Sequence, residues 1–135
     1  MLQLSQQPEA DKLLSDNPLA LLIGMVLDQQ VPLEWAFSAP LTLKQRLGGR
    51  LDVTEIAEMD PDQLAAAFLE RPALHRFPAA NAKRVQELCR IIVEQYGGEP
   101  AAVWQGASSG AELLARVRKL PGFGEQKARI FVGLL

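Results

Sequence analysis

Apolar residues recur along this chain at helical spacing, and no stretch shows the period-two alternation that is typical of a β-strand. The clearest stripe consists of Val85, Leu88, Cys89, Ile92 and Tyr96. β-branched residues are scattered, and the chain has no internal repeat of fixed period and no low-complexity tract. The pattern therefore predicts an all-α protein.

Prolines, glycines and capping residues set the predicted helix boundaries. Asn17-Pro18 supplies an N-cap followed by proline at the first helical position. The run Leu19–Leu27 behind it is apolar on all sides, which predicts a helix at the centre of the bundle. Pro40 is expected to break the next helical segment, and Gly48-Gly49 to end it. The other predicted helical segments are 33–38, 41–47, 55–59, 62–69 and 79–96, with a short piece near 100–105.

Local signals support several of these starts and ends. Either Asp52 or Thr54 can cap the helix at 55–59, and Asp60-Pro61 opens the one at 62–69. Pro78 starts the longest helix and Gly97-Gly98 terminates it.

Composition limits the classes of protein to consider. The 135 residues suffice for one domain, 1–135, and 48% hydrophobic residues with a mean hydropathy of +0.02 are ordinary for a globular protein. A single cysteine and a single histidine exclude a disulfide framework, an iron–sulfur cluster and a histidine-cysteine metal site within this chain. The longest apolar run is too short to span a bilayer and begins too deep to be a secretory signal. We expect a cytoplasmic protein, associated with the nucleoid if bacterial, and no membrane partner.

The charge is distributed unevenly. The net charge is −2, but residues 1–75 hold five basic and eleven acidic side chains, whereas residues 76–135 hold nine and five. A phosphate-binding face, if present, is therefore expected in the second half. A solvated helix surface is the alternative.

The segment Leu120-Pro-Gly-Phe-Gly-Glu-Gln-Lys-Ala128 joins two amphipathic stretches within residues 111–135 and predicts two helices connected by a tight hairpin. Pro121 ends the first helix, and Gly122 and Gly124 can adopt positive φ and leave the backbone bare. The second helix is expected to begin at about Glu125, with its free N–H groups at the positive end of the helix dipole. These are the N–H groups of Gly124, Glu125, Gln126 and Lys127. Such a helix start binds phosphate, so the hairpin favours nucleic-acid binding. A helix corner that uses Pro-Gly merely as a stop is the alternative.

The hairpin resembles the Leu-Pro-Gly-Val-Gly type hairpin of the HhH-GPD superfamily of base-excision DNA glycosylases, which includes endonuclease III and the 3-methyladenine glycosylases. Upstream, the segment Asn17–Gln30 resembles the first core helix of that family, which closes on a glutamine. The order of elements fits over roughly residues 13–135. The resemblance implies a compact helical bundle that binds damaged double-stranded DNA, flips a nucleotide and hydrolyses its N-glycosidic bond.

The resemblance also implies roles for individual residues. Gln30, with Gln29 adjacent, matches the glutamine that enters the DNA stack, although an exposed last turn of a helix would explain both residues equally simply. Besides the hairpin amides, the expected DNA contacts include Lys127, as a phosphate contact, and Arg129. Asp28 either lines a pocket or lies in solvent, and the second is favoured. Four further residues are assigned as follows: Phe123 to packing, Trp35 and Trp104 to core or rim packing, and Cys89 to the core. Lys83 and Arg84 are either a second backbone contact or a solvated helix start.

The catalytic positions of the family are not matched. Gln126 occupies the position of the lysine that acts as a Schiff-base nucleophile in bifunctional members, and Lys127 lies one residue later, about 100° around the helix. The family's catalytic aspartate follows the hairpin, but none of the eight residues after Lys127 is acidic. We therefore predict no certain catalytic residue, a monofunctional type of enzyme, and a truncated HhH-GPD fold whose C-terminal catalytic part is absent. Weak, salt-sensitive duplex binding with little or no glycosylase activity is expected. No cofactor is expected, although a monovalent cation at the hairpin is compatible with the resemblance.

Two other classes of function stay open at this point. One is a non-catalytic helix-hairpin-helix module that attaches to the DNA backbone. The other is a helical protein–protein module with no role in DNA binding. The lesion, the protein partners and the oligomeric state are not indicated by the sequence.

Overall fold

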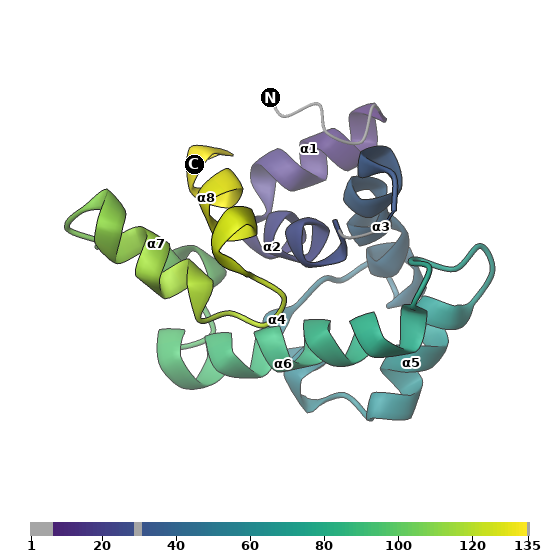
Figure 1. Cartoon of the computed structure of the whole chain (residues 1–135). Coiled ribbons are helices and arrows are strands. Elements are labelled where there is room, and N and C mark those ends of the chain that lie inside the picture. Colours follow the sequence, from purple (N-terminus) through teal and green to yellow (C-terminus); the bar gives the residue numbers. More distant parts are fainter. Residues whose placement is uncertain (1–6, 29–30, 135) are drawn as a thin grey trace.

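The computed structural model describes residues 7–28 and 31–134, and the side chains of residues 125–126 and 133–134 lie outside that description. Within it the chain forms eight α-helices and one 3-10 helix and no strand, which confirms the all-α prediction (Figure 1). The elements are α1 (Pro8–Asp16), α2 (Pro18–Leu27), α3 (Leu33–Arg46), α4 (Val53–Glu58), α5 (Pro61–Leu69), α6 (Pro78–Tyr96), η1 (Pro100–Val103), α7 (Gly110–Arg118) and α8 (Glu125–Leu134). No helix in the described ranges is long and apolar enough to cross a membrane.

Helix α2 forms the centre of the bundle, as its uniformly apolar sequence predicts. Every residue from Leu19 to Leu27 is buried, and α1, α3 and α6 pack around the helix (Figure 1). Its N-terminus is capped by Asn17, whose Oδ1 accepts hydrogen bonds from the N–H groups of Leu19 at 3.0 Å and Ala20 at 3.3 Å. The central helix is therefore fixed at its start by a local cap and along its length by burial.

Two predictions about the first third of the chain are corrected. Pro40 does not break the helix: α3 runs from Leu33 to Arg46 with Pro40 buried inside it. An interior proline costs about 3 kcal/mol, and the burial of the neighbouring Phe37 and Leu43 offsets that cost. The sequence analysis also assigned no helix before Asn17, whereas α1 occupies that region with a proline at its start.

The caps predicted for α4 and α5 and the predicted end of α6 are confirmed, although α4 begins at Val53 rather than at residue 55. Asp52 rather than Thr54 caps α4, because the Oδ1 of Asp52 accepts hydrogen bonds from the N–H groups of Thr54 at 2.9 Å and Glu55 at 3.0 Å. Asp60 caps α5 in the same way. Helix α6 ends at Gly97, whose φ of 62° is left-handed.

Side chains of α6 also terminate α4. The Nε2 of Gln86 donates hydrogen bonds to the carbonyl oxygens of Ile56 at 3.1 Å and Met59 at 2.7 Å. The Nε of Arg90 donates to the carbonyl of Ala57 at 3.2 Å. The last carbonyl groups of a helix have no intrahelical donor, so donors from a neighbouring helix satisfy them here. This kind of capping between helices recurs at the candidate site.

Cys89 is fully buried on α6, as the sequence predicted. Burial, with a smaller contribution from Asp52, raises the pKa of its thiol to about 12. We expect the native protein not to react with a thiol-specific disulfide reagent at pH 8, and to react fully in denaturant. Rapid labelling of the folded protein would contradict the burial of Cys89, and absorbance of the released chromophore measures it directly.

Candidate nucleic-acid interface

The hairpin between α7 and α8 is a type II turn built by Pro121 and Gly122. The N–H of Phe123 donates to the carbonyl of Leu120 at 3.2 Å, and Gly122 has a φ of 81°. Proline sets φ at the first central position of such a turn, and glycine adopts positive φ at the second without strain. Of the two hairpin glycines only Gly122 adopts positive φ, so the turn does not use the conformational freedom that was expected for Gly124.

Phe123 anchors the turn in the core. It is 5% exposed and its ring meets that of Phe131 edge to face at 5.6 Å. Trp104 also packs edge to face on Phe131, at 5.6 Å between ring centroids. The packing roles predicted for Phe123 and Trp104 are thereby confirmed. Trp35 likewise stacks on His75 and donates a hydrogen bond to the carbonyl of Ala73 at 3.2 Å.

Helix α8 presents its first amides beside an exposed glycine. The first N–H bonded within this segment is that of Ala128, which donates to the carbonyl of Gly124 at 2.9 Å. The N–H groups of Glu125, Gln126 and Lys127 precede it and have no carbonyl partner within the helix, by the geometry of any α-helix. Gly124 itself is exposed, and a Cβ added to it would meet nothing within 4 Å. This arrangement is the one expected for an anion site at a helix N-terminus.

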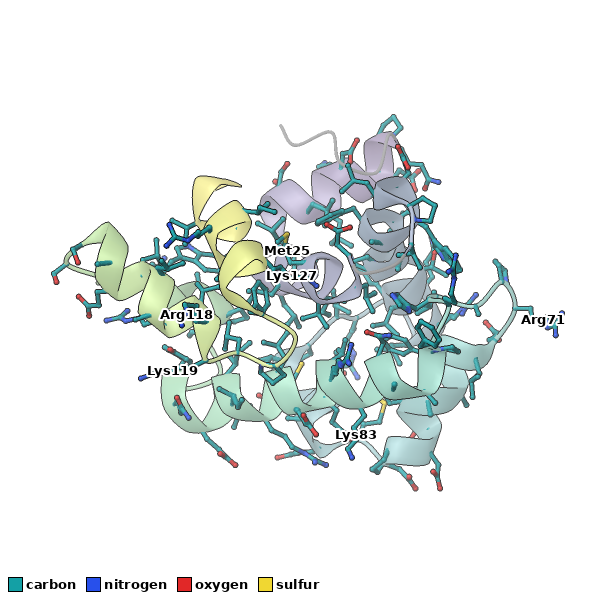
Figure 2. All side chains as sticks on the ribbon, in the orientation of Figure 1. Met25, Arg71, Lys83, Arg118, Lys119 and Lys127 are labelled. Atoms are coloured by element: carbon teal, nitrogen blue, oxygen red, sulfur yellow. The ribbon has the colours of Figure 1, made fainter. Side chains whose placement is uncertain are left out.

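Basic side chains lie on both sides of the turn. Arg118 and Lys119 are exposed at the end of α7, where it meets the hairpin, and Arg129 is exposed on α8 (Figure 2). The sequence analysis did not single out Arg118 and Lys119, although their position directly before Leu120 was a usable signal. A phosphate that approached the hairpin would therefore meet positive charge from two helices.

Arg116, on the same helix, is engaged in holding α7. Its Nη2 pairs with the Oε1 of Glu112 at 2.7 Å, and its Nη1 donates to the carbonyls of Val103 at 3.4 Å and Gln105 at 3.2 Å. Hydrogen bonds from the hydroxyl and N–H of Ser108, followed by that from Arg116, hold the pKa of Glu112 at about 2. Glu112 and Arg116 therefore form a structural cap at the start of α7.

The hairpin lies on the last turn of α2. A Cβ added to Gly122 would stand 3.3 Å from Cγ1 of Val26, so the turn approaches this side chain closely. Lys127 is half-buried, and its Nζ donates to the carbonyl oxygen of Val26 at 3.4 Å. Asp28, one residue beyond α2, is also partly buried and close enough for its charge to act on Lys127. This corrects the expectation that Asp28 simply lies in solvent.

Not every predicted site residue falls within the described structure. Gln29 and Gln30 lie outside the described residues, as do the side chains of Glu125 and Gln126. The described chain stops at Asp28 and resumes at Val31, so both glutamines follow directly from the end of α2 that the hairpin contacts. Arg84, on α6, also acts on Lys127 through its charge, whereas Lys83 is exposed (Figure 2).

No group of three potential metal-ligating side chains occurs among the described residues. Comparison with known families is decisive at this point. Residues 23–132 match the family described as HhH-GPD superfamily base excision DNA repair protein. The chain belongs to this superfamily. The match contains both the last part of α2 and the hairpin, which are the two segments that carry the resemblance in the sequence.

A solved structure supports the same fold for this HhH-GPD chain. It is similar, with a TM-score of 0.60 and 23% identity, to endonuclease III in a trapped covalent intermediate with DNA, described as an estranged-adenine complex. The similarity covers 98% of this chain and 60% of the endonuclease III chain, so the HhH-GPD chain spans about 60% of that relative. No curated protein sequence matches it.

Proposed function

We propose that this HhH-GPD protein binds double-stranded DNA through the amides of the hairpin and the cations around it. We further propose that Gln29 and Gln30 enter the base stack while a damaged nucleotide is flipped out. The observation that carries this proposal is the contact of the hairpin with the last turn of α2, made by Gly122 and Lys127 on Val26. It brings a candidate phosphate site to the end of the helix from which the two glutamines continue. The similar endonuclease III structure holds a covalent intermediate with DNA, which supports DNA as the ligand.

For the chemistry we propose hydrolysis of the N-glycosidic bond without strand cleavage. Strand cleavage by the lyase route requires an amine that attacks the sugar carbon, and the amide of Gln126, at the family's lysine position, is not nucleophilic in this way. The nearby amine, that of Lys127, is directed to the carbonyl of Val26. We therefore expect that borohydride traps no covalent adduct with abasic duplex.

A second candidate function is a non-catalytic DNA-binding module. It is favoured by one observation: Gln126 occupies the family's lysine position, so α8 offers no amine nucleophile there. Such a module would use the same amides and cations for attachment to the backbone. A base-release assay distinguishes the two functions, because only the glycosylase frees a base from a duplex that carries alkylated or deaminated bases.

Duplex binding is tested by fluorescence anisotropy of a labelled duplex over a range of salt concentrations. Each lost phosphate contact reduces the slope of log K against log salt by about 0.9. We expect Lys119→Gln and Arg129→Gln to weaken binding and to reduce the slope by roughly that amount each. Arg71→Gln is the matched control, because Arg71 is an exposed cation on a loop far from the hairpin (Figure 2).

Two results would overturn DNA binding. One is the absence of duplex binding even at low salt. The other is equal behaviour of all three variants, which would indicate non-specific attraction to positive charge. Either would favour a protein–protein role for this helical domain.

A further inference from the structure

The side chain of Lys127 is half-buried and its ammonium group is directed to the end of α2. Its Nζ is 3.4 Å from the carbonyl oxygen of Val26, 101 positions earlier in the chain. Figure 2 labels Lys127 on α8, and its contact with Val26 places the side chain against the end of α2. The side chain is half-buried, whereas that of Arg129, two residues later, is exposed. A phosphate at the hairpin would therefore meet Arg129 more readily than Lys127.

A positive charge at the C-terminal end of α2 would stabilise that helix. The last four carbonyl groups of a helix have no intrahelical donor and form the negative end of its dipole. Helix α2 has no basic residue in its last turn, and its sequence there is entirely apolar. The N–H of Asp28 donates a hydrogen bond to the carbonyl of Met25 at 3.3 Å. Lys127 thus supplies from α8 a donor and a charge that α2 itself lacks.

The carboxylate of Asp28 increases the stabilisation that a positive charge gives at this end of α2. A carboxylate at the negative end of a helix is unfavourable, and partial burial adds to the cost. Burial raises the pKa of Asp28, and the charge of Lys127 opposes that rise. In turn, burial lowers the pKa of Lys127, Asp28 opposes the fall, and Arg84 adds to it. The two groups therefore stabilise each other's charged forms at the end of α2.

Val26 is held from two directions by the hairpin. Gly122 packs on its side chain, and Lys127 binds its carbonyl oxygen. Because Gly122 lies within the turn and Lys127 in the first turn of α8, the hairpin and the start of α8 both contact the last turn of α2. Asp28 and the two glutamines continue from that same turn.

We propose that Lys127 is a positioning residue, which caps the C-terminal end of α2 from the first turn of α8 and so fixes Val26 and Asp28, the last described residues before Gln29 and Gln30 in the sequence. This inference rests on the proposed function for its consequence in DNA opening. Inserting a side chain into a duplex requires the inserted segment to resist the restacking of the bases. A half-buried cation at the end of α2 meets that requirement, and the phosphate contacts are made by the hairpin amides, Lys119 and Arg129.

The test begins with the free protein. Lys127→Met removes the charge and keeps the apolar stem, Lys127→Arg keeps the charge, and Arg129→Met is the matched control from the exposed face of the same helix. Hydrogen exchange followed by mass spectrometry reports peptides that cover residues 25–33. We expect faster exchange there in Lys127→Met, and exchange close to that of the unmodified protein in Lys127→Arg and Arg129→Met. Peptides from α4 to α6 should be unaffected in all three variants.

The second measurement uses DNA. Duplexes that carry 2-aminopurine beside a destabilised base pair report nucleotide extrusion as a rise in fluorescence. At saturating protein, Lys127→Met should give a smaller rise, with the slope of log K against log salt unchanged. Arg129→Met should keep the full rise and reduce the slope by about 0.9. Asp28→Asn removes the carboxylate that is unfavourable at this end of α2, so Lys127→Met should raise exchange and lower fluorescence less in the Asp28→Asn background than in the unmodified protein.

The outcomes separate this inference from the proposed function. If Lys127→Met reduces the salt slope and leaves exchange at residues 25–33 unchanged, Lys127 is a phosphate contact and the positioning role is overturned. If the unmodified protein binds no duplex, the proposed function fails, whereas the exchange data still decide whether Lys127 holds the turn. If Lys127→Met unfolds, Lys127→Arg and the double variant Asp28→Asn/Lys127→Met decide the same question. A cap that acts by charge is retained in Lys127→Arg and is needed less once the carboxylate is removed, so both variants should fold, and unfolding of both would overturn the positioning role.

Discussion

We expect Gly24→Ala to destabilise the protein by about 3 kcal/mol, although alanine favours a helix over glycine by about 1 kcal/mol. Gly24 lies in the middle of α2, where a Cβ would stand 2.5 Å from Cδ1 and 2.9 Å from Cε1 of Phe37. Real Cβ atoms do not approach a ring so closely, so one of the two helices must shift. Phe37 is 1% exposed and cannot turn into solvent. The clash therefore disrupts the packing of α2 against α3.

Urea unfolding followed by circular dichroism measures this cost. Gly110→Ala is the matched control, because Gly110 is the first residue of α7 and an added Cβ meets nothing within 4 Å. It should unfold at the same urea concentration as the unmodified protein or slightly higher. Combining Gly24→Ala with Phe37→Leu should recover part of the loss, since a smaller side chain makes room for the methyl group. An unchanged unfolding midpoint for Gly24→Ala would show that α2 and α3 do not pack as closely as described.

Features set by neighbouring residues could be predicted from the sequence. Asn17 and Pro18 fix the start of α2, and the apolar run behind them places that helix in the core. Pro121 and Gly122 fix the hairpin, because the type II turn needs these two residue types in this order. In each case the interaction that decides the structure is made within a few residues.

Features set by tertiary contacts could not be predicted in the same way. Pro40 was expected to break a helix, but the packing of α3 on α2 outweighs the lost hydrogen bond. Gly122 and Gly124 looked equivalent in the sequence, yet only Gly122 adopts positive φ and approaches Val26. The hydrogen bond from Lys127 to the carbonyl of Val26 joins residues that are 101 positions apart, so no local sequence pattern predicts it. The sequence thus singled out the hairpin as a candidate site, whereas the direction of its lysine required the fold.

This difference between the two glycines gives the largest expected effect on DNA binding. We expect Gly122→Ala to lower both stability and duplex affinity. Alanine at a φ of 81° costs about 1–2 kcal/mol, and its Cβ would stand 3.3 Å from Val26, so Val26 must move by a few tenths of an ångström. A hairpin displaced from α2 would misplace all the amides at the start of α8 together. We therefore expect a loss of affinity of more than about tenfold, which corresponds to about 1.4 kcal/mol.

Gly124→Ala separates the surface role from the conformational one. Gly124 is exposed, has no positive φ and would gain a Cβ with nothing within 4 Å, so the variant should unfold at the same urea concentration as the unmodified protein. Its methyl group would nevertheless lie beside the amides of Glu125 and Gln126, where a phosphate oxygen must approach closely. Disturbing one hydrogen bond to a charged group costs about 1.5 kcal/mol, so we expect roughly tenfold weaker duplex binding. Anisotropy titrations, at a temperature where circular dichroism shows both variants folded, measure the two effects. If Gly124→Ala binds like the unmodified protein, the amides do not hold a phosphate, and any loss in Gly122→Ala reflects stability alone. The hairpin would then be a structural corner, because a methyl group at Gly124 would interfere sterically with any phosphate bound to the amides at the start of α8.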